Sequence, residues 1–189
     1  MHKKLPNIFI FLDKYNSHVF NNNNTNIGII YRNYKEQNKE LELNKIASAC
    51  KKRRYKLYIS NNIRLTLKYK ADGIYLPSFN KTKKYLNLEN TNIHILGSAH
   101  SQKEIKIKIS QNCKAIFLSP IFSSKKSNKF LYLHKFNYLS QANKIDFYAL
   151  GGISKTNIRK LRLLSIKGFG GISLFKKKPA FKRPVFIKK

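Results

Sequence analysis

Ala115-Ile-Phe-Leu-Ser-Pro-Ile-Phe-Ser-Ser124 is the first of three apolar runs that end on small or hydroxyl residues. The other two are Phe147-Tyr-Ala-Leu-Gly-Gly-Ile153 and Phe169-Gly-Gly-Ile-Ser173, and more polar segments separate them. Such runs, with enough residues between them for a helix, are typical of parallel strands that are buried on both faces. Small residues after a strand let a ligand approach the main chain, and glycine pairs there expose N–H groups that can hold a phosphate. We therefore expect the functional core in this segment.

The same alternation of apolar and polar segments continues toward the N-terminus. It predicts strands at residues 7–13, 27–32, 56–60, 73–77, 93–97, 115–118, 147–150 and 170–174. It also predicts helices at 36–50, 63–70, 81–90 and 136–142, one that begins after Ser101, and one that begins after Ser154 and ends at Gly168. Eight strands that alternate with helices indicate an α/β protein. The number eight favours a compact, single-domain (β/α)8 TIM barrel over a doubly wound open sheet.

We expect one domain at residues 1–175 and a basic C-terminal tail at 176–189. No apolar run approaches the roughly 18 residues that a transmembrane helix needs. Met1-His-Lys-Lys-Leu-Pro6 leads into a short strand instead of a signal peptide, so we expect a cytoplasmic protein with no membrane partner. Cys50 and Cys113 lie far apart without metal-ligand spacing, which predicts two buried free thiols.

The charge of the chain is extreme. It has 39 Lys and Arg residues against 8 Asp and Glu residues, a formal net charge of +31. A nucleic-acid binder is one explanation, because a basic surface attracts a polyanion. The other is a compositional bias, since Lys, Asn and Ile are used freely and the lysines are spread over the whole chain. The chain has no zinc-finger or RNA-recognition pattern. We therefore favour the bias, expect no nucleic-acid partner, and expect phosphorylated substrates.

Active sites of (β/α)8 barrels lie at the C-terminal ends of the strands. Arg32 follows a predicted strand and suits an anionic ligand, although it could instead pair with Asp13 or Glu36. The loop Ser123-Ser-Lys-Lys-Ser-Asn-Lys129 combines hydroxyls and lysines, as a phosphate clamp does, or it is a solvated turn. Asp72 precedes its strand, at the opposite end, and we expect it to be structural.

Two further strand ends carry candidates. Gly151-Gly152 either contacts a phosphate or forms a tight connection between a strand and a helix. His100 either transfers protons or orders the loop after its strand. Glu104 stands three residues after Ser101, a capping-box pattern that indicates the start of a helix close to His100.

The order and spacing of these motifs resemble those of the thiamine phosphate synthase and TenI family, from residue 7 to about residue 175. The pieces that match are Arg32, Ala71-Asp-Gly-Ile-Tyr-Leu-Pro77, Gly97-Ser-Ala-His-Ser101, Ser119-Pro-Ile-Phe122, Ala149-Leu-Gly-Gly-Ile153 and Gly170-Gly-Ile-Ser173. The resemblance implies a (β/α)8 barrel that condenses hydroxymethylpyrimidine diphosphate with thiazole phosphate, releasing pyrophosphate. It implies catalytic roles for Arg32, Ser98 and Ser124, and binding of substrate or phosphate by Gly151, Gly152, Ile172, Ser173 and His100. The family's lysine after the strand at 115–118 corresponds to Ser127 here, and we assign its catalytic role to Lys126, although Lys125 or Lys129 could also substitute.

The resemblance also implies Mg²⁺ on the diphosphate, yet the two aspartates that hold it in the family correspond to Asn61 and Asn80. Asparagine offers a carbonyl oxygen without charge, and Mg²⁺ prefers carboxylates, so we assign no metal ligand. Lys125 and Lys126 could neutralise the diphosphate instead. Pro120 occupies the place of the histidine that TenI-type thiazole tautomerases use. The alternative is therefore a divergent barrel that binds a phosphorylated thiamine precursor without synthase activity. A homo-oligomer is compatible with the sequence.

Overall fold

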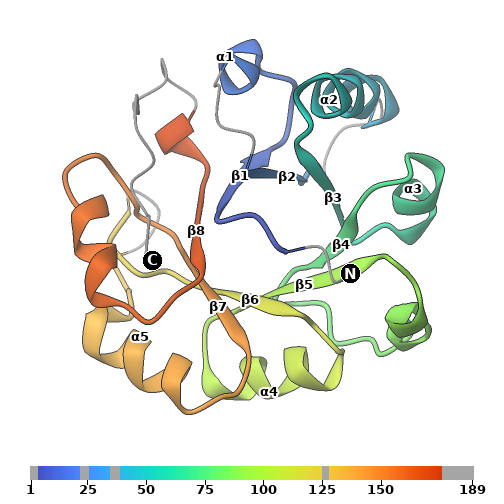
Figure 1. The fold of residues 1–189 in the computed structure, drawn as a ribbon. Coiled ribbons are helices and arrows are strands. Elements are labelled where there is room, and N and C mark those ends of the chain that lie inside the picture. Colours follow the sequence, from blue (N-terminus) through green and yellow to red (C-terminus); the bar gives the residue numbers. More distant parts are fainter. Residues whose placement is uncertain (1–3, 22–25, 35–38, 125–127, 176–189) are drawn as a thin grey trace.

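Eight parallel strands close into a barrel in the order of the chain (Figure 1). The computed structural model describes residues 4–21, 26–34, 39–124 and 128–175. The predicted tail at 176–189 lies outside the described residues. The strands are β1 (Ile8–Leu12), β2 (Ile27–Tyr31), β3 (Lys56–Ser60), β4 (Gly73–Leu76), β5 (His94–Ala99), β6 (Ala115–Leu118), β7 (Asp146–Leu150) and β8 (Gly168–Gly171). Ile8 of β1 pairs with Phe169 of β8, which closes the barrel. The predicted (β/α)8 barrel is thus confirmed.

A helical segment follows each strand, on the outside of the barrel (Figure 1). The α-helices are α1 (Ser17–Phe20), α2 (Lys39–Arg53), α3 (Ile63–Lys68), α4 (Gln102–Ser110) and α5 (Tyr132–Gln141), and the 3-10 helices are η1 (Leu86–Asn90), η2 (Ile158–Leu163) and η3 (Ser173–Phe175). Ser101 caps α4 as predicted, because its hydroxyl accepts a hydrogen bond from the Glu104 N–H.

Several elements differ from the predictions. Most of the predicted helix at 81–90 is a loop that ends in η1, and the predicted helix from Ser154 is replaced by a turn and η2. The Ser154 hydroxyl bonds to Thr156 at 2.8 Å, while the side chain of Asn157 accepts from the Ser154 N–H, so these local bonds hold the chain in a turn. Gly168 begins β8 instead of ending a helix, and β5 runs on to Ala99.

Aromatic rings fill the interior of the barrel. The Phe9 ring lies 5.1 to 5.4 Å, centroid to centroid, from the rings of Tyr58, Phe117 and Tyr148, each in an edge-on arrangement. These rings and their neighbours Phe11 and Tyr75 belong to one buried cluster inside the barrel. The barrel is therefore a packed core, and ligands have to bind at its two ends.

Two further apolar clusters lie between the strands and the helices. The thiols of Cys50 and Cys113 belong to them, and burial raises the pKa of each thiol to about 12. Asp72 accepts hydrogen bonds from the Lys56 ammonium at 2.8 Å and from the Leu57 N–H at 3.0 Å, at the N-terminal side of β4. The predictions of two buried free thiols and of a structural Asp72 are confirmed.

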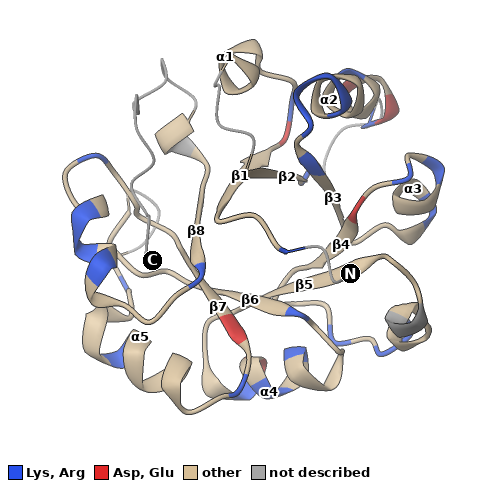
Figure 2. Ribbon diagram, viewed as in Figure 1, with Lys and Arg blue, Asp and Glu red and all other residues tan. Residues whose placement is uncertain are grey.

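Charged side chains are distributed widely over this framework. Figure 2 shows Lys and Arg on helices and loops around the whole barrel, with few acidic residues between them. No helix within the described ranges is long and apolar enough to cross a membrane.

Candidate active site at the mouth of the barrel

A cavity of about 430 Å³ opens where the C-terminal ends of β8, β1 and β2 meet. Its lining residues belong to the segments that follow these three strands or to the end of β1: Phe11, Leu12, Asp13, Lys14, Arg32, Asn33, Tyr34 and Ile172. The structure thus brings Arg32, a candidate for the diphosphate, and Ile172, a candidate for the thiazole phosphate, to one cavity.

Arg32 is fixed at the rim of the barrel by its own main chain and by a ring. Its N–H donates to the Leu12 carbonyl at 2.7 Å, and its guanidinium carbon lies 5.5 Å from the centroid of the Phe11 ring. Burial raises the pKa of Tyr75 to about 12, although a hydrogen bond with Ser98 and the charge of Arg32 each lower it. Ser98, on the strand β5, is buried next to this neutral phenol.

The Gly151-Gly152 turn packs against the loop that follows β6. Both glycines have positive φ, +92° and +69°, and a Cβ on Gly152 would lie 2.2 Å from the Phe122 carbonyl oxygen. The Phe122 N–H donates to the Gly151 carbonyl at 3.2 Å. Within the part of the chain that the structure describes, no acceptor is found for the N–H groups of Gly152 and Ile153. The turn can therefore offer two main-chain donors to an anion beside the loop of Ser124.

Asn157 shapes this turn, and the sequence analysis missed it. Its amide nitrogen donates to the Gly152 carbonyl at 2.9 Å, and its amide oxygen accepts from the Ser154 N–H at 2.9 Å. The signal in the sequence was an asparagine three residues after Ser154, where a side chain can bond back to the turn.

His100 links the ends of β5 and β6. Its Nδ1 lies 2.8 Å from the Ser119 carbonyl oxygen and 3.2 Å from the Ser119 hydroxyl. Its main-chain N–H donates to the Glu104 carboxylate at 2.6 Å. These contacts are those of a residue that orders the loop after β5.

Asn61 and Asn80, which follow β3 and β4, bond to each other. The Asn80 amide nitrogen donates to the Asn61 amide oxygen at 2.5 Å, and the Asn80 amide oxygen accepts from the Thr82 N–H at 2.9 Å. Both carbonyl oxygens are thus engaged, and neither carries charge. No group of three or more His, Cys, Asp and Glu side chains that could hold a metal occurs among the described residues. This donor set does not fit Mg²⁺, which prefers carboxylate oxygens.

An aromatic pair lies beside the two asparagines. The Tyr34 and Phe79 rings meet edge to face, with centroids 5.9 Å apart, and both are exposed. The Tyr34 hydroxyl bonds to the Ser60 hydroxyl at 2.7 Å, which joins the loop after β2 to the end of β3. The pattern of polar groups at strand ends does not mark Phe79, because its side chain is apolar. The pair offers an apolar edge to a ring-shaped substrate.

Of the remaining candidate site residues, some lie within the described part of the chain and others lie outside it. Ser124 lies in the described loop after β6, whereas Lys125 and Lys126 lie outside the described residues, as does Glu36, the possible partner of Arg32. Ile172 is 37% exposed, and Ser173 begins η3 directly after it. The roles inferred for these residues stay predictions.

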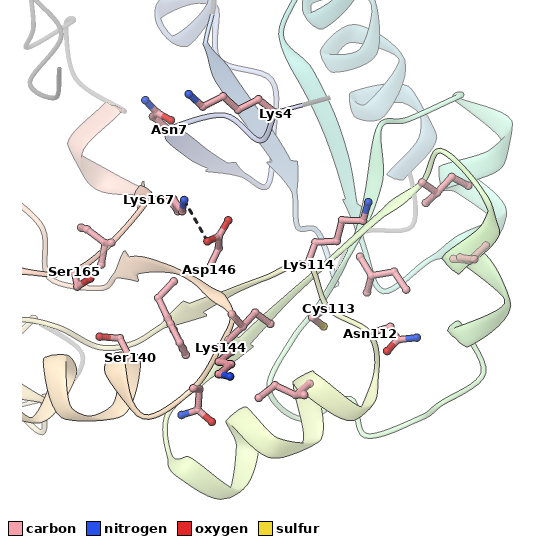
Figure 3. Close-up of a pocket in the computed structure, with 18 residues that line it drawn as sticks. Lys4, Asn7, Asn112, Cys113, Lys114, Ser140, Lys144, Asp146, Ser165 and Lys167 are labelled. Atoms are coloured by element: carbon pink, nitrogen blue, oxygen red, sulfur yellow. Dashed lines mark ion pairs between the residues drawn. The ribbon is translucent and has the colours of Figure 1, made fainter. Parts of the chain in front are cut away.

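A larger cavity, about 1270 Å³, lies at the other end of the barrel (Figure 3). Figure 3 shows Lys167 facing Asp146, with which it forms an ion pair at 3.5 Å, and Lys4, Lys114 and Lys144 around them. Four lysines among 18 lining residues is about the same fraction as 39 Lys and Arg among 189 residues. The cavity is therefore no more basic than the chain as a whole, and it lies away from the C-terminal strand ends where such barrels act.

Comparisons with known proteins agree with the geometry. The family model described as thiamine monophosphate synthase matches residues 26–175. A "Thiamine-phosphate synthase" of Prochlorococcus marinus is 30% identical over 129 residues, which are 67% of this chain and 37% of that protein, so the chain spans little more than a third of it. A "Putative thiamine-phosphate synthase 2" of Aquifex aeolicus is 32% identical over 143 residues, covering 72% of this chain and 77% of that protein. The structure of a thiamine phosphate pyrophosphorylase from Pyrococcus furiosus has a TM-score of 0.74 at 16% identity and covers 94% of this chain and 90% of its own, which shows the shared fold.

Proposed function

The chain belongs to the thiamine monophosphate synthase family, and we propose that it joins hydroxymethylpyrimidine diphosphate to thiazole phosphate, forming thiamine phosphate and pyrophosphate. The bond between the pyrimidine methylene carbon and the diphosphate oxygen breaks, and the diphosphate leaves with the electron pair. The lone pair of the thiazole nitrogen then forms the new carbon–nitrogen bond. No proton has to be transferred, so the protein has to position two anionic substrates and stabilise the leaving charge.

The single observation that carries this proposal is the cavity that Arg32 and Ile172 share at the mouth of the barrel. Arg32 can bind the departing diphosphate through its planar fork of N–H donors. Ile172, Ser173 and the Gly151-Gly152 turn are the groups proposed for the thiazole phosphate. The N–H groups of Gly152 and Ile153 support this, because they have no acceptor among the described residues. Tyr34 and Phe79 provide the apolar edge against which a pyrimidine ring can pack.

The second candidate function is binding of a phosphorylated thiamine precursor without catalysis. It is favoured by the hydrogen-bonded Asn61 and Asn80 pair, because a site without metal ligands has less positive charge with which to stabilise the leaving diphosphate.

One experiment separates the two functions. Purified full-length protein is incubated with both substrates, once with Mg²⁺ and once with EDTA, and thiamine phosphate is quantified. We expect turnover under both conditions. Absence of turnover, in a sample that binds thiazole phosphate by calorimetry, would contradict the synthase proposal and favour the binding function. Lys125→Ala with Lys126→Ala tests whether these lysines assist; unchanged turnover would remove them from the proposed site.

A further inference from the structure

A buried ammonium group lies directly behind the loop that carries Asn80. The side chain of Lys108, on α4, has no solvent exposure. Its Nζ donates to the Asn80 carbonyl at 2.7 Å, to the Pro77 carbonyl at 2.8 Å and to the Gln111 amide oxygen at 2.9 Å. Three acceptors match the three N–H donors of a protonated lysine, so the geometry is that of a charged ammonium.

This charge has no ion-pair partner among the described residues, because no carboxylate there lies within ion-pairing distance of Lys108. Burial lowers the pKa of Lys108, and the charge of Glu104, four residues earlier in the chain, raises it by less. A buried charge without a counter-charge is costly to maintain, and its field is screened much less than that of a surface lysine. The site on the other side of the loop, at Asn61 and Asn80, therefore lies in a positive field.

The residues around Lys108 leave room for its side chain and hold the loop that it contacts. A Cβ on Gly97 would lie 2.8 Å from Lys108 Cδ, so the bare glycine in β5 leaves room for the lysine stem. The Gln111 amide nitrogen donates to the Asn80 carbonyl at 3.2 Å and to the Thr82 carbonyl at 2.7 Å. Lys108 and Gln111 together thus tie α4 to the loop that presents the Asn80 side chain.

The charge at this place differs from that of the family pattern. Two aspartates with one Mg²⁺ sum to zero. In this chain the two positions hold neutral amides, and the Lys108 ammonium adds a positive charge behind one of them. A carboxylate at position 61 or 80 would need a cation to offset it before a diphosphate could approach, and an amide does not.

We propose that Lys108 is a positioning residue that replaces the divalent cation in this barrel, holding the Asn80 loop and providing the positive field in which a diphosphate binds without metal. The inference deepens the proposed function, since the diphosphate is the ligand of the same mouth. It can nevertheless be tested without turnover, by binding of inorganic pyrophosphate.

The first test compares Lys108→Met with Lys106→Met, an exposed lysine on the same helix, so that both variants lose one charge. Pyrophosphate affinity is measured by calorimetry in EDTA, and thiazole phosphate affinity is measured in parallel. We expect Lys108→Met to bind pyrophosphate about tenfold more weakly, with thiazole phosphate affinity unchanged, and Lys106→Met to stay within about twofold of the parent protein. Equal losses in the two variants would overturn the inference.

A second variant covers the case in which Lys108→Met does not fold. Asn61→Asp with Asn80→Asp keeps Lys108 and restores two carboxylates. We expect the unchanged protein to bind pyrophosphate equally well in EDTA and in Mg²⁺, and the double variant to lose affinity in EDTA and recover it with Mg²⁺. A requirement for Mg²⁺ in the unchanged protein would overturn the inference. Metal-free binding without turnover would contradict the synthase proposal and leave the role of Lys108 intact.

Discussion

Arg32 is held in place before a ligand arrives, by the Leu12 carbonyl and the Phe11 ring. Arg32→Ala removes the charge-assisted hydrogen bonds proposed for the diphosphate, each worth about 1.5 to 3 kcal/mol. We expect pyrophosphate to bind roughly 10- to 100-fold more weakly in calorimetry. Arg32→Lys keeps the charge and loses the planar fork of N–H donors, so its pyrophosphate affinity should lie between those of the parent protein and Arg32→Ala. Unchanged affinity in Arg32→Ala would place the diphosphate elsewhere.

The two thiols make stability depend on alkaline pH. Burial raises the pKa of Cys50 and Cys113 to about 12, against about 8.5 for an exposed thiol. Above pH 8.5 only the unfolded chain releases these protons, so the free energy of unfolding should fall as pH rises, by up to about 1.4 kcal/mol per pH unit for each thiol. Urea unfolding between pH 8 and 10 measures this slope. In the double variant Cys50→Ala with Cys113→Ala, the free energy of unfolding should fall less steeply with pH. An equal slope in the two proteins would contradict the prediction.

Single residues also mark where prediction from sequence ends. The sequence located Arg32, Ile172 and the glycine pair, because strand ends in a barrel can be read from apolar runs. Strand ends also place Asn61 and Asn80 at the mouth, and the family resemblance matches them to the metal-binding aspartates. Their mutual hydrogen bond could not be predicted, because it depends on two loops meeting in space. The burial of Lys108 could not be predicted, because nothing in the sequence distinguishes it from the other lysines of the same helix.

At the scale of elements, the turn after β7 is where local geometry and proposed chemistry coincide. Gly152→Ala would introduce a Cβ at a φ of +69° and 2.2 Å from the Phe122 carbonyl oxygen. We expect a loss of about 1 to 3 kcal/mol in the free energy of unfolding, from strain, together with weaker binding of thiazole phosphate. Ser154→Ala is the matched control in the same turn, since its hydroxyl bonds to Thr156. Chemical unfolding and calorimetry give the two readouts, and a Gly152→Ala protein that matches the control would contradict this account.

Strands could be predicted better than helical segments for a physical reason. A strand buried on both faces needs a continuous apolar run, and β3 and β6 therefore have the bounds that the sequence predicts. The segments η1 and η2 depend on hydrogen bonds of single polar side chains, such as Asn157, which compete with helical bonds. Apolar spacing alone does not report this competition.

The whole molecule combines a solid interior with a strongly basic exterior. Because aromatic rings pack the inside of the barrel, a ligand has to bind at one of its ends, and the site proposed at Arg32, Ile172 and the Gly151-Gly152 turn lies at the C-terminal end of the strands. The positive charge is not concentrated at one end of the barrel: Figure 2 shows Lys and Arg spread over its helices and loops. Selective recognition by the mouth and general attraction by the surface should therefore respond differently to salt.

Oligonucleotide binding tests this separation. With a net charge of +31, the protein should bind any oligonucleotide at low salt, with a log affinity that falls linearly with log salt and no sequence preference. Removal of residues 176–189, which hold seven Lys and Arg residues, should make the slope shallower and leave pyrophosphate affinity at the mouth unchanged. Fluorescence anisotropy over a salt series and calorimetry with pyrophosphate measure the two effects. Sequence-specific binding that survives near-physiological salt would mean that the charge is a nucleic-acid surface after all, because a compositional bias supplies attraction without the base contacts that specificity requires.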